Sequence, residues 1–137
     1  MSPADTPRCL AIIICEGVVE DAQSRNKCIL NTFNNIWAAR FPVAHDRLTV
    51  FASLTNGQGE MPLEVRFVQE RKPEPLLVLT GAIRFPGPQE IVDLTVNLRQ
   101  IPIPEPGPYV VQLWMNQKLI GERGVNAKLI PQQEPKP

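Results

Sequence analysis

The sequence has few of the residues on which catalytic and metal sites depend. His45 is the only histidine, and the three cysteines form no C-x-x-C pair. Nucleophilic catalysis requires a thiol or hydroxyl beside a base, so the Cys–His combinations to consider are Cys15 or Cys28 with His45. Zinc sites require paired His and Cys ligands at short spacing, which this chain lacks. We therefore expect no catalytic residues, no metal and no cofactor, and we predict that the protein is not an enzyme.

The sequence also lacks an excess of charge of either sign. Lys plus Arg and Asp plus Glu are both 14, which gives a net charge of zero. Nucleic-acid binders neutralise phosphates with basic side chains, so this balance argues against a nucleic-acid partner. Binding of a single strand on a sheet face would require arginines to cluster beside exposed aromatic residues. The arginines concerned are Arg66, Arg84, Arg99 and Arg123.

Long hydrophobic runs are missing as well. The apolar run Leu10–Cys15 is too short to span a bilayer, and it has neither the basic flank nor the cleavage site of a signal peptide. We expect no membrane contact and a cytoplasmic location, where the cysteines are reduced thiols.

Turn residues and alternating patterns are abundant. Fifteen prolines and eight glycines favour turns and work against long helices. Apolar and polar residues alternate in short runs such as Leu63–Val68 and Ile91–Leu98, which is typical of strands with one buried face. About eight such runs recur at spacings near a dozen residues. The pattern predicts an all-β domain, an antiparallel immunoglobulin-like β-sandwich of about seven to nine strands with at most one short helix.

Several local structures follow from this pattern. We divide the chain into a flexible lead-in (1–8), one sandwich domain (9–130) and a disordered proline-rich tail (131–137). The most helix-like piece is 34–40, which ends before Pro42. We expect the runs 48–54 and 63–68 to form a hairpin around the turn 56–59. The predicted core residues are Leu10, Ile12, Ile14, Leu30, Phe33, Val50, Leu63, Val65, Phe67, Leu79, Val92, Leu94, Val96, Tyr109, Val111 and Leu113.

The stretch 104–120 is the best-specified part of the chain. Its spacing Glu105-x-Gly107-x-Tyr109 resembles the tyrosine corner of immunoglobulin-like domains, in which a Tyr hydroxyl bonds back to the corner backbone. Val111 stands where an antibody domain would have cysteine, so the resemblance is to the sandwich in general. From Tyr109 the chain predicts a strand, a turn at 116–118 and a returning strand, together a hairpin at the edge of the sandwich.

Several short motifs together resemble an uncharacterised bacterial family of small cytoplasmic β-sandwich proteins. They extend over residues 9–129 and are Cys15-Glu16, Asn26-Lys27, Phe33-Asn34-Asn35-Ile36, Phe41-Pro42, Gly59-Glu60 and Gly107-Pro108-Tyr109. The family often has Asp in place of Glu16 and a Gly-Lys turn in place of Asn26-Lys27. The resemblance implies an immunoglobulin-like fold and supplies no activity or catalytic residue.

Two functions remain open. The first is a non-enzymatic protein-interaction or assembly module, with a protein partner or self-association through the hairpin residues Trp114, Leu119 and Ile120, which could pair with another chain at a sheet edge. Trp114 serves this role only if its strand face is exposed rather than core. The alternative is a small-molecule-binding sandwich with a loop-end pocket near Trp37, His45 and Asn56. Trp37 is also expected to fill one end of the core.

Overall fold

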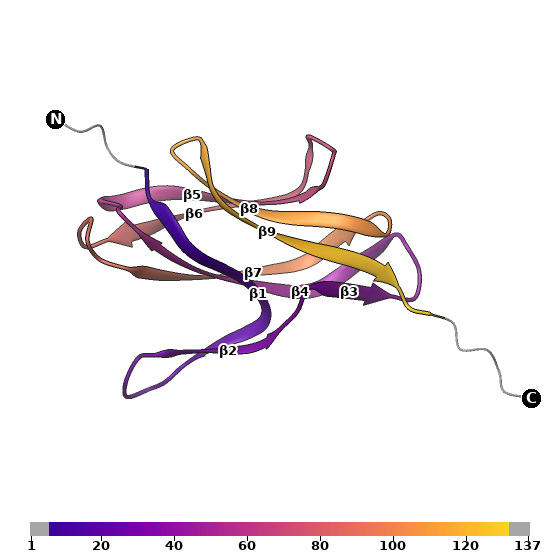
Figure 1. The fold of residues 1–137 in the computed structure, drawn as a ribbon, viewed down its shortest axis with the longest axis horizontal. Helices are drawn as coiled ribbons and strands as arrows, with labels where there is room; N and C mark the ends of the chain where they lie inside the picture. Colours follow the sequence, from indigo (N-terminus) through magenta and orange to yellow (C-terminus); the bar gives the residue numbers. More distant parts are fainter. Residues whose placement is uncertain (1–5, 132–137) are drawn as a thin grey trace, which may run out of the picture.

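The structure is a computed structural model that describes residues 6–131. Within that range it contains nine strands and no helix, and so no helix there could cross a membrane (Figure 1). The all-β prediction is confirmed. The predicted lead-in and tail fall mainly on 1–5 and 132–137, outside the described residues. The strands are β1 (Arg8–Glu20), β2 (Lys27–Thr32), β3 (Asn35–Ala38), β4 (Val43–Thr55), β5 (Gly59–Gln69), β6 (Pro75–Phe85), β7 (Val92–Ile103), β8 (Gly107–Met115) and β9 (Lys118–Leu129).

The strands form two sheets that enclose one hydrophobic core (Figure 1). The four-stranded sheet has the order β2-β1-β4-β7, and the five-stranded sheet has the order β3-β9-β8-β5-β6. Neighbouring strands are antiparallel, except that β3 runs parallel to β9. In immunoglobulin-like domains, strands A, B and E share one sheet while C, F and G share the other. Here β1, β4 and β7 take the first set of places and β5, β8 and β9 the second, so the predicted immunoglobulin-like sandwich is confirmed.

The predicted tyrosine corner is present at the start of β8. The Tyr109 hydroxyl donates a hydrogen bond of 2.5 Å to the Glu105 carbonyl and accepts one of 3.2 Å from the Glu105 N–H. The Tyr109 ring is buried and stacks on the ring of Phe67 of β5, with 5.3 Å between the two ring centres. The corner thus ties the β7–β8 connection to the core between the sheets.

The β8–β9 hairpin also forms, but its position differs from the prediction. Asn116 and Gln117 both have positive φ (51° and 60°), the backbone form that two-residue hairpin turns require. The predicted edge location is wrong for β8, which lies between β5 and β9. The far end of β9 is covered by β3, and Gly121 of β9 lies so close to Cys9 of β1 that an added Cβ would be 2.7 Å from the Cys9 Sγ.

The helix predicted over 34–40 is wrong. Asn35–Ala38 forms the short strand β3, which pairs with Asn126–Leu129 of β9. Strand alternation then places Ile36 and Ala38 in the core and turns Trp37 outward, with 52% of its surface exposed. Trp37 therefore does not fill the core as expected. Four residues are too few for the two periodicities to be distinguished by sequence.

The hairpin predicted between β4 and β5 is also wrong, because these strands lie in different sheets. The turn after β4 carries the chain across the sandwich, and the Asn56 N–H donates to the Pro88 carbonyl at 3.0 Å. A Cβ added at Gly57 would lie 2.4 Å from the ring of Phe85, so this crossing depends on glycine. The hairpin partner of β5 is β6.

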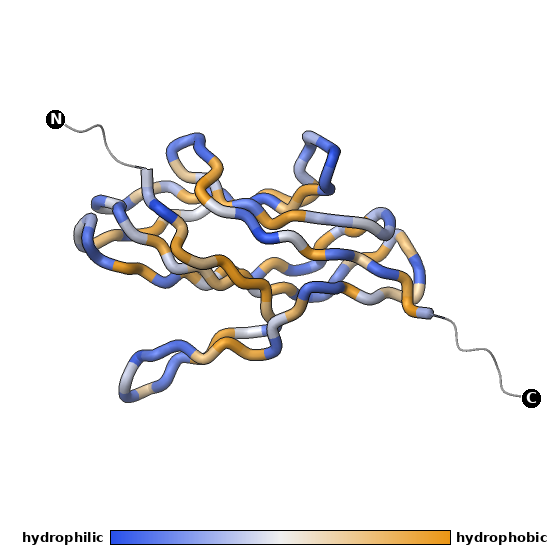
Figure 2. Tube along the Cα trace, in the orientation of Figure 1, coloured by the Kyte–Doolittle hydropathy of each residue, from blue (hydrophilic) through white to orange (hydrophobic). Residues whose placement is uncertain are grey.

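The core follows the predicted alternation in β5, β7 and β8. Three predicted core residues are nevertheless exposed: Leu10, Leu30 and Leu79. Leu10 lies at a bulge that shifts the register of β1. Leu30 belongs to the β1–β2 hairpin, which projects from the sandwich with a hydrophilic tip (Figure 2). Leu79 lies on β6, the outer strand of its sheet.

Candidate interaction surface

Trp114 lies on the outer face of the five-stranded sheet. Tyr109, Val111, Leu113 and Met115 point inward along β8, so alternation turns Trp114 to the opposite face, where it is half-buried. Its indole Nε1–H donates to the Gln112 side-chain carbonyl at 3.0 Å. Trp114 therefore lies at the surface of the protein and not in its core.

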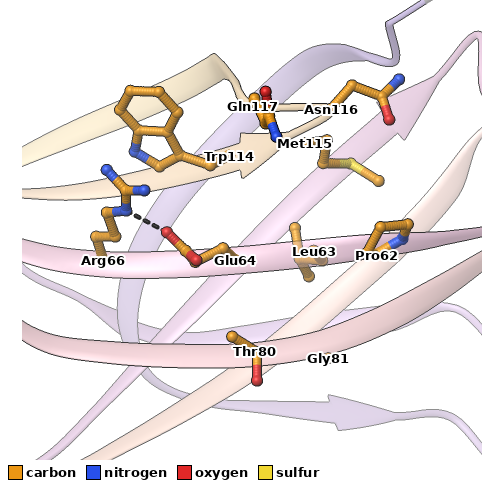
Figure 3. Close-up of a pocket in the computed structure, with 10 residues that line it drawn as sticks. All are labelled: Pro62, Leu63, Glu64, Arg66, Thr80, Gly81, Trp114, Met115, Asn116 and Gln117. Carbon is orange, nitrogen blue, oxygen red and sulfur yellow. Dashed lines mark hydrogen bonds and ion pairs between the residues drawn. The ribbon is translucent and has the colours of Figure 1, made fainter.

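Arg66 of β5, which stands opposite Gln112, also contacts the indole. Its guanidinium carbon lies 4.3 Å from the centre of the Trp114 ring, which is within cation–π range. The Arg66 Nε also donates to the Glu64 carboxylate, shown as the dashed line in Figure 3. Glu64 stands directly opposite Trp114 in the β5–β8 register. The ring of Trp114 thus contacts polar neighbours on both β5 and β8.

The other two predicted contact residues behave differently from each other. Leu119 of β9 stands opposite Trp114, and 41% of its surface is exposed. A bulge between Leu113 and Trp114 inserts Ile120 as an extra residue on β9, and its side chain packs partly against the core. The structure therefore brings Trp114 and Leu119 together on the outer face and turns Ile120 inward.

A groove of about 520 Å³ runs beside the indole. β5 forms its floor, β6 one wall and the end of the β8–β9 hairpin the other (Figure 3). The sequence predicts that Glu64 and Arg66 face outward, but their contact with Trp114 depends on the β5–β8 register, which the sequence does not reveal. The residues that line the groove include Glu64, Arg66, Thr80, Gly81 and Trp114.

Trp37 and His45 lie together in a second cleft, of about 590 Å³, at the other end of the molecule. The Phe33 and His45 rings are 6.3 Å apart, and burial lowers the pKa of His45 below its usual value. The Lys128 ammonium lies 5.5 Å from the Trp37 ring centre. Asn56 is not part of this cleft. It follows the far end of β4, roughly 35 Å from His45 for extended chain at about 3.3 Å per residue.

The structure does not bring the candidate Cys–His pairs together. Cys15 of β1 stands opposite Thr49, four residues along β4 from His45, or roughly 13 Å of strand. Cys15 is buried, which raises its thiol pKa, and its Sγ donates to the Gly17 carbonyl. Cys28 stands opposite Val19 on β2, in the hairpin that projects from the sandwich (Figure 1). Among residues 6–131, no group of three or more His, Cys, Asp or Glu side chains is placed to hold a metal ion.

Fold and surface together define an immunoglobulin-like β-sandwich with an outward tryptophan on its five-stranded sheet. Residues 10–127 match the profile of a family of unknown function (DUF6941), and the chain belongs to this family. No functionally curated protein shows significant similarity to the sequence.

Three solved structures are similar to the chain at low sequence identity. An immunoglobulin-like protein (PA1606) from Pseudomonas aeruginosa is 13% identical over 93% of this chain and 100% of its own, with a TM-score of 0.47. The alkylpurine DNA glycosylase AlkC from Pseudomonas fluorescens is 10% identical over 89% of this chain, with a TM-score of 0.49. A β-glucosidase from Listeria innocua is 11% identical over 85% of this chain, with a TM-score of 0.45. The chain spans only 30% and 16% of the lengths of these two enzymes.

Proposed function

We propose that the protein is a non-enzymatic protein-interaction module that binds its partner through Trp114 and Leu119. The observation that carries this proposal is the indole of Trp114, which is partly exposed and contacts both Arg66 and Gln112 beside the groove. Side chains that are fixed before binding lose little conformational freedom when a partner covers them.

The chemistry of the surface suits a protein ligand. Tryptophan and arginine are enriched among residues that dominate binding energy at protein interfaces. Arg66 is already paired with Glu64, so the floor of the groove carries no uncompensated charge. The occupant we propose is a segment of a partner protein that inserts an aliphatic or aromatic side chain beside Trp114.

A selection from a displayed library of random peptides on the immobilised full chain tests this proposal. We expect enriched peptides that bind Trp114→Ala at least tenfold more weakly than the wild type, because truncation of a central anchor residue typically costs about 2 kcal/mol or more. Ile91→Ala is the matched control, since Ile91 is 62% exposed and lies before β7, in the other sheet. Failure to enrich any peptide, or equal binding to Trp114→Ala, would contradict the proposal.

The second cleft supports a different candidate function, the binding of a small molecule. Trp37 and His45 line it together with polar groups, and the Arg123 guanidinium donates to the Asn34 side chain at 3.1 Å beside it. An aromatic ring with convergent polar groups is typical of small-ligand sites. A screen that follows the fluorescence of a Trp114→Phe variant, in which Trp37 is the remaining tryptophan, tests this candidate.

We also propose that this is a bacterial protein and that it is located in the cytoplasm. The support is that Cys9, Cys15 and Cys28 are all free thiols, as is usual for proteins of reducing compartments. Cell fractionation of the native protein tests the location directly, and recovery in an extracytoplasmic fraction would contradict it.

A further inference from the structure

β6 is the outer strand of the five-stranded sheet, with β5 as its one neighbour in that sheet. All residues from Val78 to Ala82 are exposed, whichever face they occupy. Leu79 shows that the inner face of β6 is also uncovered. It stands opposite the buried Val65 and so points toward the inner face, yet 37% of its surface is exposed. The opposing sheet therefore leaves the middle of β6 uncovered.

This edge lacks the features that usually prevent strands from pairing between molecules. Natural edge strands are commonly protected by charged residues, by proline or by short length. The segment Leu76–Ala82 contains no charged residue and no proline. The other sheet edges are better protected within the described residues, since β3 has four residues, β2 has six, and β7 carries Asp93 and Arg99. β6 is therefore the edge best suited to accept another strand.

We propose that a second copy of this chain pairs with β6, antiparallel and edge to edge, in a symmetric dimer centred on Leu79. In this register Leu79 faces Leu79 of the second copy, and the two half-exposed side chains cover each other. Val78 then faces Thr80, and Leu77 faces Gly81. The two five-stranded sheets become one continuous sheet through a two-fold axis, so that the same surface is used twice.

Charge complementarity selects this register. When Leu79 lies on the axis, Arg84 of each copy approaches the start of β6 in the other copy. Glu74 precedes Pro75 there, beyond a bulge at Leu76, so the two opposite charges come near each other twice by symmetry. Moving the axis to Val78 would shift Arg84 away from Glu74 and toward Lys72 of the β5–β6 turn, which is repulsive. Moving it to Thr80 would place Arg84 opposite the apolar Leu76.

Glu74 and Arg84 are both exposed and available for this contact. Within residues 6–131, neither forms an ion pair, although Glu60 of β5 stands opposite Arg84 in the sheet register. The dimer does not use Trp114, which is separated from β6 by β5, although Thr80 and Gly81 of β6 also line the groove beside the indole.

Light scattering on the purified full chain tests the dimer. We expect twice the chain mass for the wild type. Glu74→Arg should weaken the dimer about tenfold or more, because two attractive charge pairs become repulsive. The double variant Glu74→Arg/Arg84→Glu should restore it, since the pairs are then reversed. Glu90→Arg is the control, as this exposed residue lies in the β6–β7 loop, and circular dichroism checks that each variant is folded.

Cross-linking tests the register itself. In a Cys28→Ser background, Leu79→Cys should oxidise to a covalent dimer, because directly opposed strand residues are about 4.5–5.5 Å apart at Cα, within disulfide reach. Thr80→Cys should not, because its own copy lies at a diagonal position about 7–8 Å away. A monomeric wild type, or a dimer that Glu74→Arg leaves intact and Leu79→Cys does not cross-link, would overturn the inference. A dimer dissociated by Trp114→Ala would overturn it too, while leaving the peptide-binding proposal to its own test.

Discussion

The hydroxyl of Tyr109 both donates to and accepts from the backbone of Glu105, four residues earlier in the chain. The two hydrogen bonds close the corner between β7 and β8 and anchor it on a buried ring. The ring in turn stacks on Phe67 of β5. One side chain thus fixes both the entry of β8 into its sheet and the packing of β8 beside β5, the two strands that carry the Trp114 surface.

Removing this hydroxyl should measure the contribution of the corner to stability. Tyr109→Phe keeps the ring and leaves the Glu105 N–H and carbonyl without their partner. We expect a loss of about 1–3 kcal/mol in the free energy of unfolding, measured by urea denaturation. Trp37→Phe is the control, since this exposed ring should change stability by less than about 0.5 kcal/mol. A loss for Tyr109→Phe no larger than that of the control would show that the corner does not stabilise the fold.

A side chain at position 57 should lower the stability of the protein. An alanine Cβ would lie 2.4 Å from the Phe85 ring, which is fully buried and has little room to move. We expect Gly57→Ala to cost about 1–3 kcal/mol by overpacking. Gly87→Ala is the matched control, because nothing lies within 4 Å of its Cβ position. Adding Phe85→Leu should reduce the cost of Gly57→Ala, and purely additive effects in this double-mutant cycle would contradict the contact.

His45 should make stability depend on pH. Burial lowers its pKa in the folded protein, so folding favours the neutral imidazole. The stabilisation is present above the unfolded-state pKa, near 6.5, and is lost as the pH falls through the lower folded-state pKa. Urea unfolding of the wild type should therefore show a larger loss between pH 7.5 and pH 5 than unfolding of His45→Asn. Identical pH profiles for the two proteins would show that His45 is not desolvated.

Local patterns predict most of the fold correctly. The alternation in β5 and β8 assigns the buried faces, and the spacing of Glu105, Gly107 and Tyr109 predicts the corner bond that is observed. These features depend on residues close together in the sequence. The same holds for the β8–β9 turn, whose two central residues adopt positive φ.

The sequence does not predict which strands pair when they lie far apart in the chain. Nothing in the 48–54 and 63–68 runs indicates that β4 and β5 separate into different sheets, because the turn between them also suits a hairpin. Likewise, Leu79 lies in the run 76–80, whose apolar residues on both faces indicate a covered strand, and only its place on an outer strand exposes it. Of the predicted sites, Trp114 and Leu119 meet because of the β8–β9 register, whereas Asn56 is far from His45 because β4 is long.

The two tryptophans allow one measurement to show which of the two candidate sites a selected peptide occupies. In a ¹H–¹⁵N correlation spectrum, the indole N–H groups of Trp37 and Trp114 give two signals, which a Trp114→Phe variant assigns. The selected peptide should be titrated into the full chain while both signals are followed. We predict that the Trp114 signal shifts in a saturable manner and that the Trp37 signal stays in place. A shift of the Trp37 signal alone would contradict the account and move the binding site to the cleft around His45.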